Sequence, residues 1–236
     1  MLQQPGEDPI GFFGYLRFSA KGREETMTII KANFGDRPSE STVKTEKKED
    51  TPAPLYQLHV SLAFSDPLIW RRLLVPGELT LRELHQVLQV CMSWSGEFNH
   101  QFYIGKIFYS ASASSTAGMR FHEANHILAD LEEAMKWCCT YIYDAGAGWE
   151  HEIVLEDALP PAARRSSPRV VDGEWAVPPE SIDGVHSYSE LLYAWENPED
   201  RQSKKLLEAH DLSGFDPYRF DKEAINEELE RCGRWQ

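Results

Sequence analysis

The segment His122-Glu123-Ala124-Asn125-His126 has the spacing that most directly indicates chemistry in this chain. In zinc proteases with this pattern, two histidines one helical turn apart share a metal and the glutamate activates water. Here a Ser-rich stretch precedes the pattern, no His-x-x-Gly-x-x-His extension follows it, and a third ligand would have to be Glu150 or Glu152. We therefore favour the start of a helix with exposed histidines, and we keep a zinc site at His122, Glu123 and His126 as the alternative.

A second group of ionisable residues lies around a glycine-containing turn. Asp144, His151 and Glu180, with His100 as a fourth member, combine carboxylates with imidazoles, which can bind a metal or transfer protons. In the alternative interpretation, Asp144 caps the turn through its own backbone, and His151 is a strand residue whose ring has a hydrogen-bond partner. Trp149 is expected in the core or in a pocket wall. The candidate pocket therefore consists of His100, Asp144, Trp149, His151 and Glu180, and no catalytic residue is assigned.

Two arginines follow Trp70 and are a third candidate for binding. Arg71 and Arg72 could contact a phosphate or a carboxylate. Consecutive residues of a strand face opposite sides of the sheet, so we expect one arginine to pair with an acid and the other to extend along the surface with its charge in water. No P-loop, GxGxxG or GxSxG pattern occurs, so nucleotide binding and α/β-hydrolase chemistry have no local support.

The elements that position these residues begin with alternating apolar residues. Residues 56–64 alternate at period two and predict a strand, and residues 69–75 predict a second strand after a turn. Thr80 and Glu83 form a capping-box pair before apolar residues at helical spacing. This pattern predicts a helix that ends near Ser93.

The rest of the chain alternates between short strands and helices. A helix is expected to begin near Phe121 or His126. Glycines in the turn at residues 144–148 predict a β-hairpin, and residues 160–179 are expected to form a long connection. The remaining predicted elements are strands at 101–104, 107–110, 137–143 and 149–155, and helices near 187–195, 200–209 and 222–231.

This order of elements indicates an α+β fold with a mixed or antiparallel sheet and packed helices. We expect a single compact domain over residues 55–236. Residues 37–54 are rich in Ser, Thr, Pro, Lys and Glu, which is typical of a flexible linker. Residues 1–36 form an N-terminal extension whose two β-prone runs could pair as a hairpin.

Composition excludes several classes of protein. The chain has a net charge of -14, and an acidic chain of this kind argues against general nucleic-acid binding, which depends on Lys and Arg. No apolar run is long enough to span a membrane, and no secretory signal is apparent at the N-terminus. The four cysteines form neither a disulfide framework nor a CxxC pair. We expect an intracellular protein that is located in the cytoplasm, and a nuclear location is the alternative.

Collinear sequence blocks resemble the plasmid pRiA4b ORF-3-like family. They recur in order over most of residues 56–226, which is more specific than any single motif. The blocks are Tyr56-Gln57-Leu58, Pro67-Leu68-Ile69-Trp70-Arg71-Arg72, Leu81-Arg82-Glu83-Leu84-His85, Met92-Ser93-Trp94, His100-Gln101-Phe102, Tyr143-Asp144 with Trp149 and His151, Pro178-Pro179-Glu180, Phe215-Asp216-Pro217 and Asn226.

The resemblance implies a compact α+β domain. It also implies an association, in part of the family, with plasmids and insertion elements, where a resolvase-like (TnpR-like) label is attached. No residue set for DNA strand transfer is present here. The chain also departs from the family at its best-marked turn, which usually reads Asp-Phe-Gly-Asp, because Ala145 and Ala147 replace the Phe and the second Asp. Any metal or polar network that relatives hold there is expected to be incomplete in this chain.

These observations favour a non-catalytic interaction domain, derived from an accessory protein of a mobile element. A groove near Asp144, Trp149 and His151 would recognise another protein or a peptide. No cofactor is expected. The alternative is a metal-dependent hydrolase, with zinc, that uses either His122, Glu123 and His126 or Asp144 and His151. Neither general nucleic-acid binding nor membrane binding is expected.

Overall fold

The structure is a computed structural model that describes residues 53–111, 120–136, 138–161, 167–210, 212 and 215–233. These residues belong to one compact unit within Lys48–Gln236. The N-terminal extension with its expected hairpin, and the linker up to residue 52, lie outside the described residues. Within the described ranges, every helix is too short or too polar to traverse a lipid bilayer.

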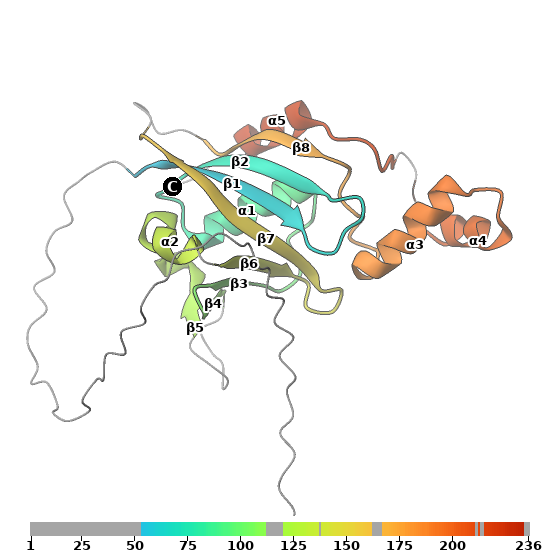
Figure 1. The fold of residues 1–236 in the computed structure, drawn as a ribbon, viewed down its shortest axis with the longest axis horizontal. Coiled ribbons are helices and arrows are strands. Elements are labelled where there is room, and N and C mark those ends of the chain that lie inside the picture. The colour runs from blue at the N-terminus through green and yellow to red at the C-terminus, as the bar shows by residue number, and fades with distance from the viewer. Residues whose placement is uncertain are drawn as a thin grey trace, which may run out of the picture. The chain divides into compact units, whose positions relative to one another are not determined.

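One mixed sheet of eight strands organises the unit (Figure 1), in the order β5-β4-β3-β6-β7-β1-β2-β8. Neighbouring strands are antiparallel except for β4 and β5, which are parallel. The fold class is therefore α+β with a mixed sheet, as predicted. The strands are β1 Leu55–Leu62, β2 Trp70–Pro76, β3 His100–Ile104, β4 Ile107–Ser110, β5 Arg120–His122, β6 Cys139–Tyr143, β7 Trp149–Leu159 and β8 Arg169–Glu174.

Five α-helices accompany the sheet in the described residues. In Figure 1, α1 lies behind the strands, α5 lies beside β8, and α3 and α4 form a pair beside the sheet. The helices are α1 Leu81–Met92, α2 Leu128–Met135, α3 Gly184–Glu196, α4 Arg201–Ala209 and α5 Lys222–Cys232, with a short 3-10 helix, η1, at Glu123–Asn125.

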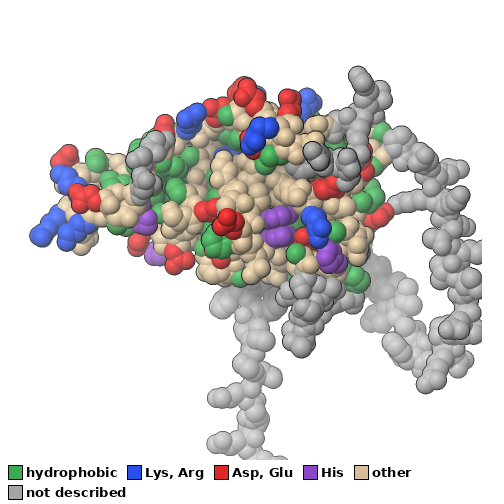
Figure 2. All heavy atoms as spheres, turned by 180° about the vertical axis from the view of Figure 1, so that it is seen from behind, with side chains coloured by type: hydrophobic (Ala, Val, Ile, Leu, Met, Phe, Trp, Pro, Cys, Tyr) green, Lys and Arg blue, Asp and Glu red, His purple; other side chains and the backbone are tan. Residues whose placement is uncertain are grey.

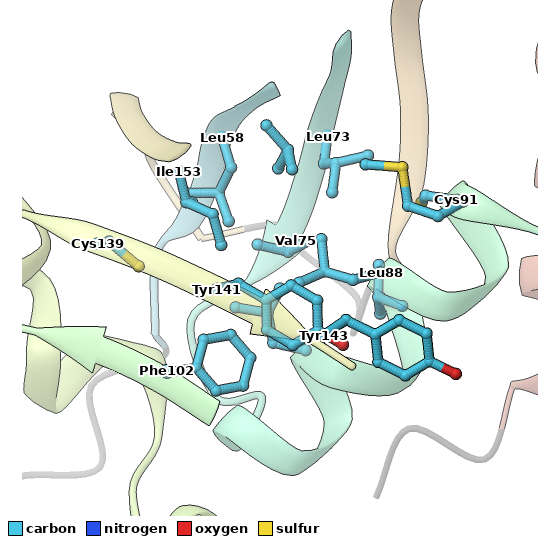
Figure 3. Packing of buried hydrophobic residues seen from close by; sticks show 14 of the residues in the cluster. Leu58, Leu73, Val75, Leu88, Cys91, Phe102, Cys139, Tyr141, Tyr143 and Ile153 are labelled. Carbon is cyan, nitrogen blue, oxygen red and sulfur yellow. The ribbon is translucent and has the colours of Figure 1, made fainter. Parts of the chain in front are cut away.

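Helix α1 has the ends that its sequence predicts. The Thr80 side chain accepts a hydrogen bond from the Glu83 N–H, and the Glu83 carboxylate accepts one from the Thr80 N–H at 2.7 Å, so the capping box is complete. Ser93 ends the helix in the left-handed conformation. Its apolar face packs on the sheet, and Figure 3 shows Leu88 beside Val75 and the ring of Tyr143 in the core.

The predicted hairpin is also confirmed, because β6 and β7 pair antiparallel across residues 144–148. The start of α3 approaches this turn closely. A Cβ at Gly184 would lie 2.6 Å from the Ala147 carbonyl oxygen, and Gly184 has a φ of +79°. Only glycine fits this position without displacing the backbone.

Two expectations were wrong. The helix expected from Phe121 or His126 begins at Leu128, because Phe121 pairs with Tyr109 in the parallel β4–β5 ladder. The long connection expected at residues 160–179 contains strand β8, which pairs with β2. As an edge strand, β8 buries little of its sequence, so its apolar alternation is weak. Asn226 of α5 reinforces it: the amide donates to the Val170 carbonyl at 2.9 Å and accepts from the Val170 N–H at 2.8 Å.

Candidate functional site

Asp144 is a structural residue of the β6–β7 turn. It adopts a left-handed conformation with a φ of 48°. Its carboxylate accepts a hydrogen bond from the Gly146 N–H at 3.0 Å, and its carbonyl accepts one from the Gly148 N–H at 2.6 Å. This is the self-capped turn of our alternative interpretation, and it leaves one carboxylate oxygen for other contacts.

Trp149 and His151 lie on the inner face of β7 and are fully buried, with 0% exposure. The Trp94 ring contacts both, with centroid distances of 5.5 Å to Trp149 and 5.4 Å to His151. Burial lowers the pKa of His151 to about 4, against a smaller opposing effect of the nearby backbone of Tyr141 and Trp149. Neither ring nitrogen of His151 makes a hydrogen bond of normal geometry to a described residue, although we expected a bonded ring. Both side chains are therefore core residues that a partner cannot reach in this conformation.

Glu180 joins a different set of residues. Its carboxylate accepts hydrogen bonds from the Tyr143 hydroxyl at 2.5 Å, from the Ser95 N–H at 3.0 Å and from the Ser95 hydroxyl at 3.1 Å. The Trp94 ring stacks on Tyr143 at 5.1 Å. Burial, and then the hydrogen bond to Glu180, raise the pKa of Tyr143. Glu180 therefore ties the segment after β8 to the loop after α1.

His100 belongs to a buried polar cluster that sequence reasoning missed. Its ring stacks on the ring of His85 from α1, with centroids 3.5 Å apart and planes 5° apart. Its Nε2 donates to the Glu123 carboxylate at 2.8 Å, and the Arg82 guanidinium lies 3.7 Å from the other carboxylate oxygen. Burial would raise the pKa of Glu123, but the hydrogen bond from His100 and the charges of His100, His85 and Arg82 together lower it.

The far side of this cluster centres on the hydroxyl of Tyr141. Gln89 donates to the Tyr141 hydroxyl at 2.7 Å, and His85 Nδ1 lies 2.8 Å from the same oxygen. The Tyr141 hydroxyl therefore joins Gln89 to His85, and it donates to His85 Nδ1 when His85 carries its proton on Nε2. Burial, followed by the charge of His100, lowers the pKa of His85 to about 4, so His85 is neutral at pH 7. The only sequence indication of this cluster was that His85 lies on the apolar face of the predicted helix.

The His122-to-His126 segment does not form an α-helical turn. His122 ends β5 and accepts from the Ala124 N–H at 3.3 Å, and residues 123–125 form the 3-10 helix η1. His126 is extended, and its ring meets Tyr109 edge-on at 5.0 Å. The pattern of zinc proteases needs both imidazoles on one face of an α-helix, which this backbone does not provide. Among the described residues, no group of three or more His, Cys, Asp or Glu side chains is arranged to hold a metal ion.

A cavity of about 560 Å³ lies between α1 and α5, and we call it the α1–α5 cavity. Its buried floor includes Arg71 and Gln89, and its exposed rim includes Asp216 and Arg219. Its apolar walls come from α1 and the loop after it, the segment after β8, and the region of α5: Val90, Trp94, Val177, Phe215, Phe220 and Ile225.

The two arginines of the Trp70 segment have separate roles. Arg72 donates two hydrogen bonds to the Glu156 carboxylate, at 2.7 and 2.9 Å, which confirms the expected pairing with an acid. The other arginine was expected to hold its charge in water, and this was wrong: Arg71 is only 2% exposed and lines the α1–α5 cavity. Burial lowers the pKa of Arg71 to about 10, so it is charged at pH 7.

Charged side chains on the face shown in Figure 2 are mixed. Basic side chains of the described residues occur singly or in small groups among acidic ones, and they form no continuous basic area on this face. The described residues on this face therefore lack the basic stripe that usually follows a nucleic-acid backbone.

Comparison with known proteins gives a family and a fold. Residues 54–224 match the family described as plasmid pRiA4b ORF-3-like protein. The chain is similar to the uncharacterised protein y4hQ of Sinorhizobium fredii (strain NBRC 101917 / NGR234), with 27% identity over 165 residues that cover 70% of this chain and 84% of that protein. It is also similar to the crystal structure of MM3350, a protein of unknown function from Methanosarcina mazei Go1. That match has a TM-score of 0.65 and 28% identity, and it covers 74% of this chain and 97% of that one.

Proposed function

The chain belongs to the plasmid pRiA4b ORF-3-like protein family, and from this premise we propose that it is a non-catalytic binding domain whose α1–α5 cavity receives part of a protein or peptide partner. The observation that carries the proposal is the cavity itself. Its volume of about 560 Å³ falls within the usual range of binding pockets, roughly 300–1,000 Å³. Its walls are mainly apolar and its floor carries one buried cation, which is the usual composition of a specific binding pocket.

The arrangement of ionisable residues supports binding over catalysis. The described residues that line the cavity include no histidine, cysteine or lysine. The carboxylates that sequence analysis singled out lie elsewhere: Asp144 in its turn, Glu180 with Tyr143, and Glu123 with His100. The carboxylates that line the cavity each have a contact of their own: Asp216 with the Tyr218 N–H, Asp221 with Arg219, and Glu228 with Arg231. A general acid or base must reach its substrate, and these groups are engaged in structural contacts instead.

The acidic composition and the mixed surface of Figure 2 support a protein or peptide partner over a nucleic acid. Because Trp149 and His151 are buried, we place the recognition groove at the α1–α5 cavity and not beside the β6–β7 turn. Descent from an accessory protein of a mobile element stays a prediction of the family resemblance.

Affinity capture with the full chain tests this function. Ala224 is exposed and lines the cavity, so Ala224→Trp should block it without removing a core side chain. Ala209→Trp, at an exposed position of α4, is the matched control. We expect a partner that is retained by the wild type and by Ala209→Trp but is lost by Ala224→Trp.

Two results would contradict the proposal. One is a set of captured proteins that is the same for all three chains. The other is turnover of ester, peptide or phosphoester substrates by protein purified without chelator, with stoichiometric zinc that is lost in His126→Ala. The second result would favour the metal-dependent hydrolase.

A further inference from the structure

Arg71 is a buried cation with no acidic partner among the described residues. Its guanidinium donates to three backbone carbonyls: Nη1 to Trp70 at 2.7 Å and to Glu174 at 2.8 Å, and Nη2 to Trp175 at 2.7 Å. These acceptors are neutral. Its Nε is buried and has no hydrogen-bond partner in the part of the chain that the structure describes. The Phe220 ring lies under the guanidinium at 4.6 Å, which stabilises the cation without neutralising it.

The acids at the cavity rim do not compensate this charge, because each already has contacts of its own. Asp221 pairs with Arg219 at 2.8 Å and caps α5, and Glu228 pairs with Arg231 through two hydrogen bonds. Asp216 accepts from the Tyr218 N–H at 3.0 Å. The positive charge in the floor of the cavity is therefore available to a ligand.

A second polar atom at the cavity also lacks a partner. Gln89 lines the cavity and is 6% exposed; its amide nitrogen bonds Tyr141, but its Oε1 is buried and accepts no hydrogen bond from a described residue. An unpaired buried acceptor is unfavourable, and an N–H group from a ligand would satisfy it. Arg71 lies on β2 and Gln89 lies on α1. The unpaired cation and the unpaired acceptor are therefore two separate indications of a ligand.

Together these features specify one ligand chemistry. Arg71 would pair with an anion, Gln89 Oε1 would accept a hydrogen bond from an N–H group, and the walls would contact an apolar group. The acidic rim disfavours a ligand with several negative charges. The last residue of a polypeptide, if it is apolar, combines one carboxylate, one amide N–H and an apolar side chain.

We propose that the α1–α5 cavity binds the apolar C-terminal residue of a partner polypeptide, with its carboxylate facing Arg71. The inference rests on the proposed function and names its ligand. Because Arg71 Nε and Gln89 Oε1 are both covered in the structure, binding includes a rotation of at least one of these side chains.

Calorimetric titration of the full chain tests the charge requirement. The probes are a pentapeptide ending in leucine, with a free or an amidated C-terminus, together with N-acetyl-leucine and hexanoate. We expect the free-acid pentapeptide to bind at least about tenfold more tightly than its amide, a difference typical of one charged contact. N-acetyl-leucine carries the carboxylate, the amide N–H and the apolar side chain of the proposed ligand, so it should bind more tightly than hexanoate, which lacks the N–H. Equal affinity for acid and amide overturns the proposal, and hexanoate binding as tightly as the peptide assigns the cavity to small carboxylic acids instead.

Two variants test whether Arg71 and the cavity are responsible for peptide binding. Arg71→Met should remove the preference for acid over amide. Because loss of Arg71 could also unfold the protein, Ala224→Trp provides a second test: it should abolish binding of the free-acid peptide, and Ala209→Trp should not. If partner capture depends on the cavity while acid and amide bind alike, this inference fails and the proposed function stands. If Ala224→Trp changes neither capture nor peptide binding, both fail.

Discussion

The buried histidine of β7 makes the stability of the protein depend on pH. His151 is fully buried, contacts the Trp94 ring, and has no acidic side chain bonded to it among the residues that the structure describes. Its pKa is lowered to about 4 by burial, against about 6.5 in an unfolded chain. Because the unfolded state takes up the proton more readily, the contribution of this residue is fully present above about pH 6.5 and is lost as the pH falls toward 4.

The size of the effect follows from these two values. One pKa unit corresponds to about 1.36 kcal/mol, so acidification from pH 7 to about pH 4.5 should remove about 2–3 kcal/mol of unfolding free energy through His151. Leucine has a similar size and does not titrate. His151→Leu should therefore unfold with nearly the same free energy as the wild type at pH 7, and it should become the more stable protein by about 2–3 kcal/mol near pH 4.5. Protonation of His85 occurs in both proteins and cancels in the comparison.

Urea unfolding at several pH values, followed by tryptophan fluorescence, gives the difference between the two proteins directly. His186→Leu is the control, because this side chain is exposed and its contact with Glu190 should change stability by less than about 1 kcal/mol. A difference between the wild type and His151→Leu that stays constant within about 0.5 kcal/mol from pH 7 to pH 4.5 would refute the reasoning. It would mean that the ring of His151 is protonated, or reached by water, in the folded protein.

Three further predictions concern the rest of the site. Tyr141→Phe removes the shared partner of a buried amide and a buried imidazole and should lower the unfolding free energy by about 2–4 kcal/mol. Tyr188→Phe, at a buried tyrosine without a described hydrogen bond, should lower it by less than about 1 kcal/mol in the same urea titration. Gly184→Ala should destabilise by more than about 2 kcal/mol, because its Cβ would meet the Ala147 carbonyl, whereas Gly148→Ala, with open space around it, should show only the backbone cost of about 1 kcal/mol. EDTA should leave the Tm unchanged within about 1 °C, and a fall of several degrees would reveal a structural metal.

The strands and helices that local patterns specify were predicted well. Apolar and polar residues alternate over 56–62, and the capping box at Thr80 defines one end of α1, so both elements can be recognised from the sequence. Strand β8 was not predicted because it is an edge strand with few buried side chains. Strand β5 was not predicted because it has only the residues Arg120–His122 and depends on parallel pairing with β4.

The candidate site was harder to predict, because it depends on contacts between distant elements. Sequence reasoning grouped Asp144, His151, Glu180 and His100 by residue type, and the fold distributes them among a turn, the core and two hydrogen-bonded clusters. The partner of His100 is Glu123, which was singled out for a different reason. The stack of His85 on His100 follows from how α1 lies on β3, and no sequence period indicates it.

The amide of Asn226 has a consequence for how this domain can associate with other chains. By bonding both the N–H and the carbonyl of Val170, it imitates the backbone of a ninth strand at the border of β8. Polypeptides that extend a sheet need those groups free, and here a helix side chain already occupies two of them. Fibre-like growth and strand exchange should therefore be discouraged at this border, and association there would depend on side chains.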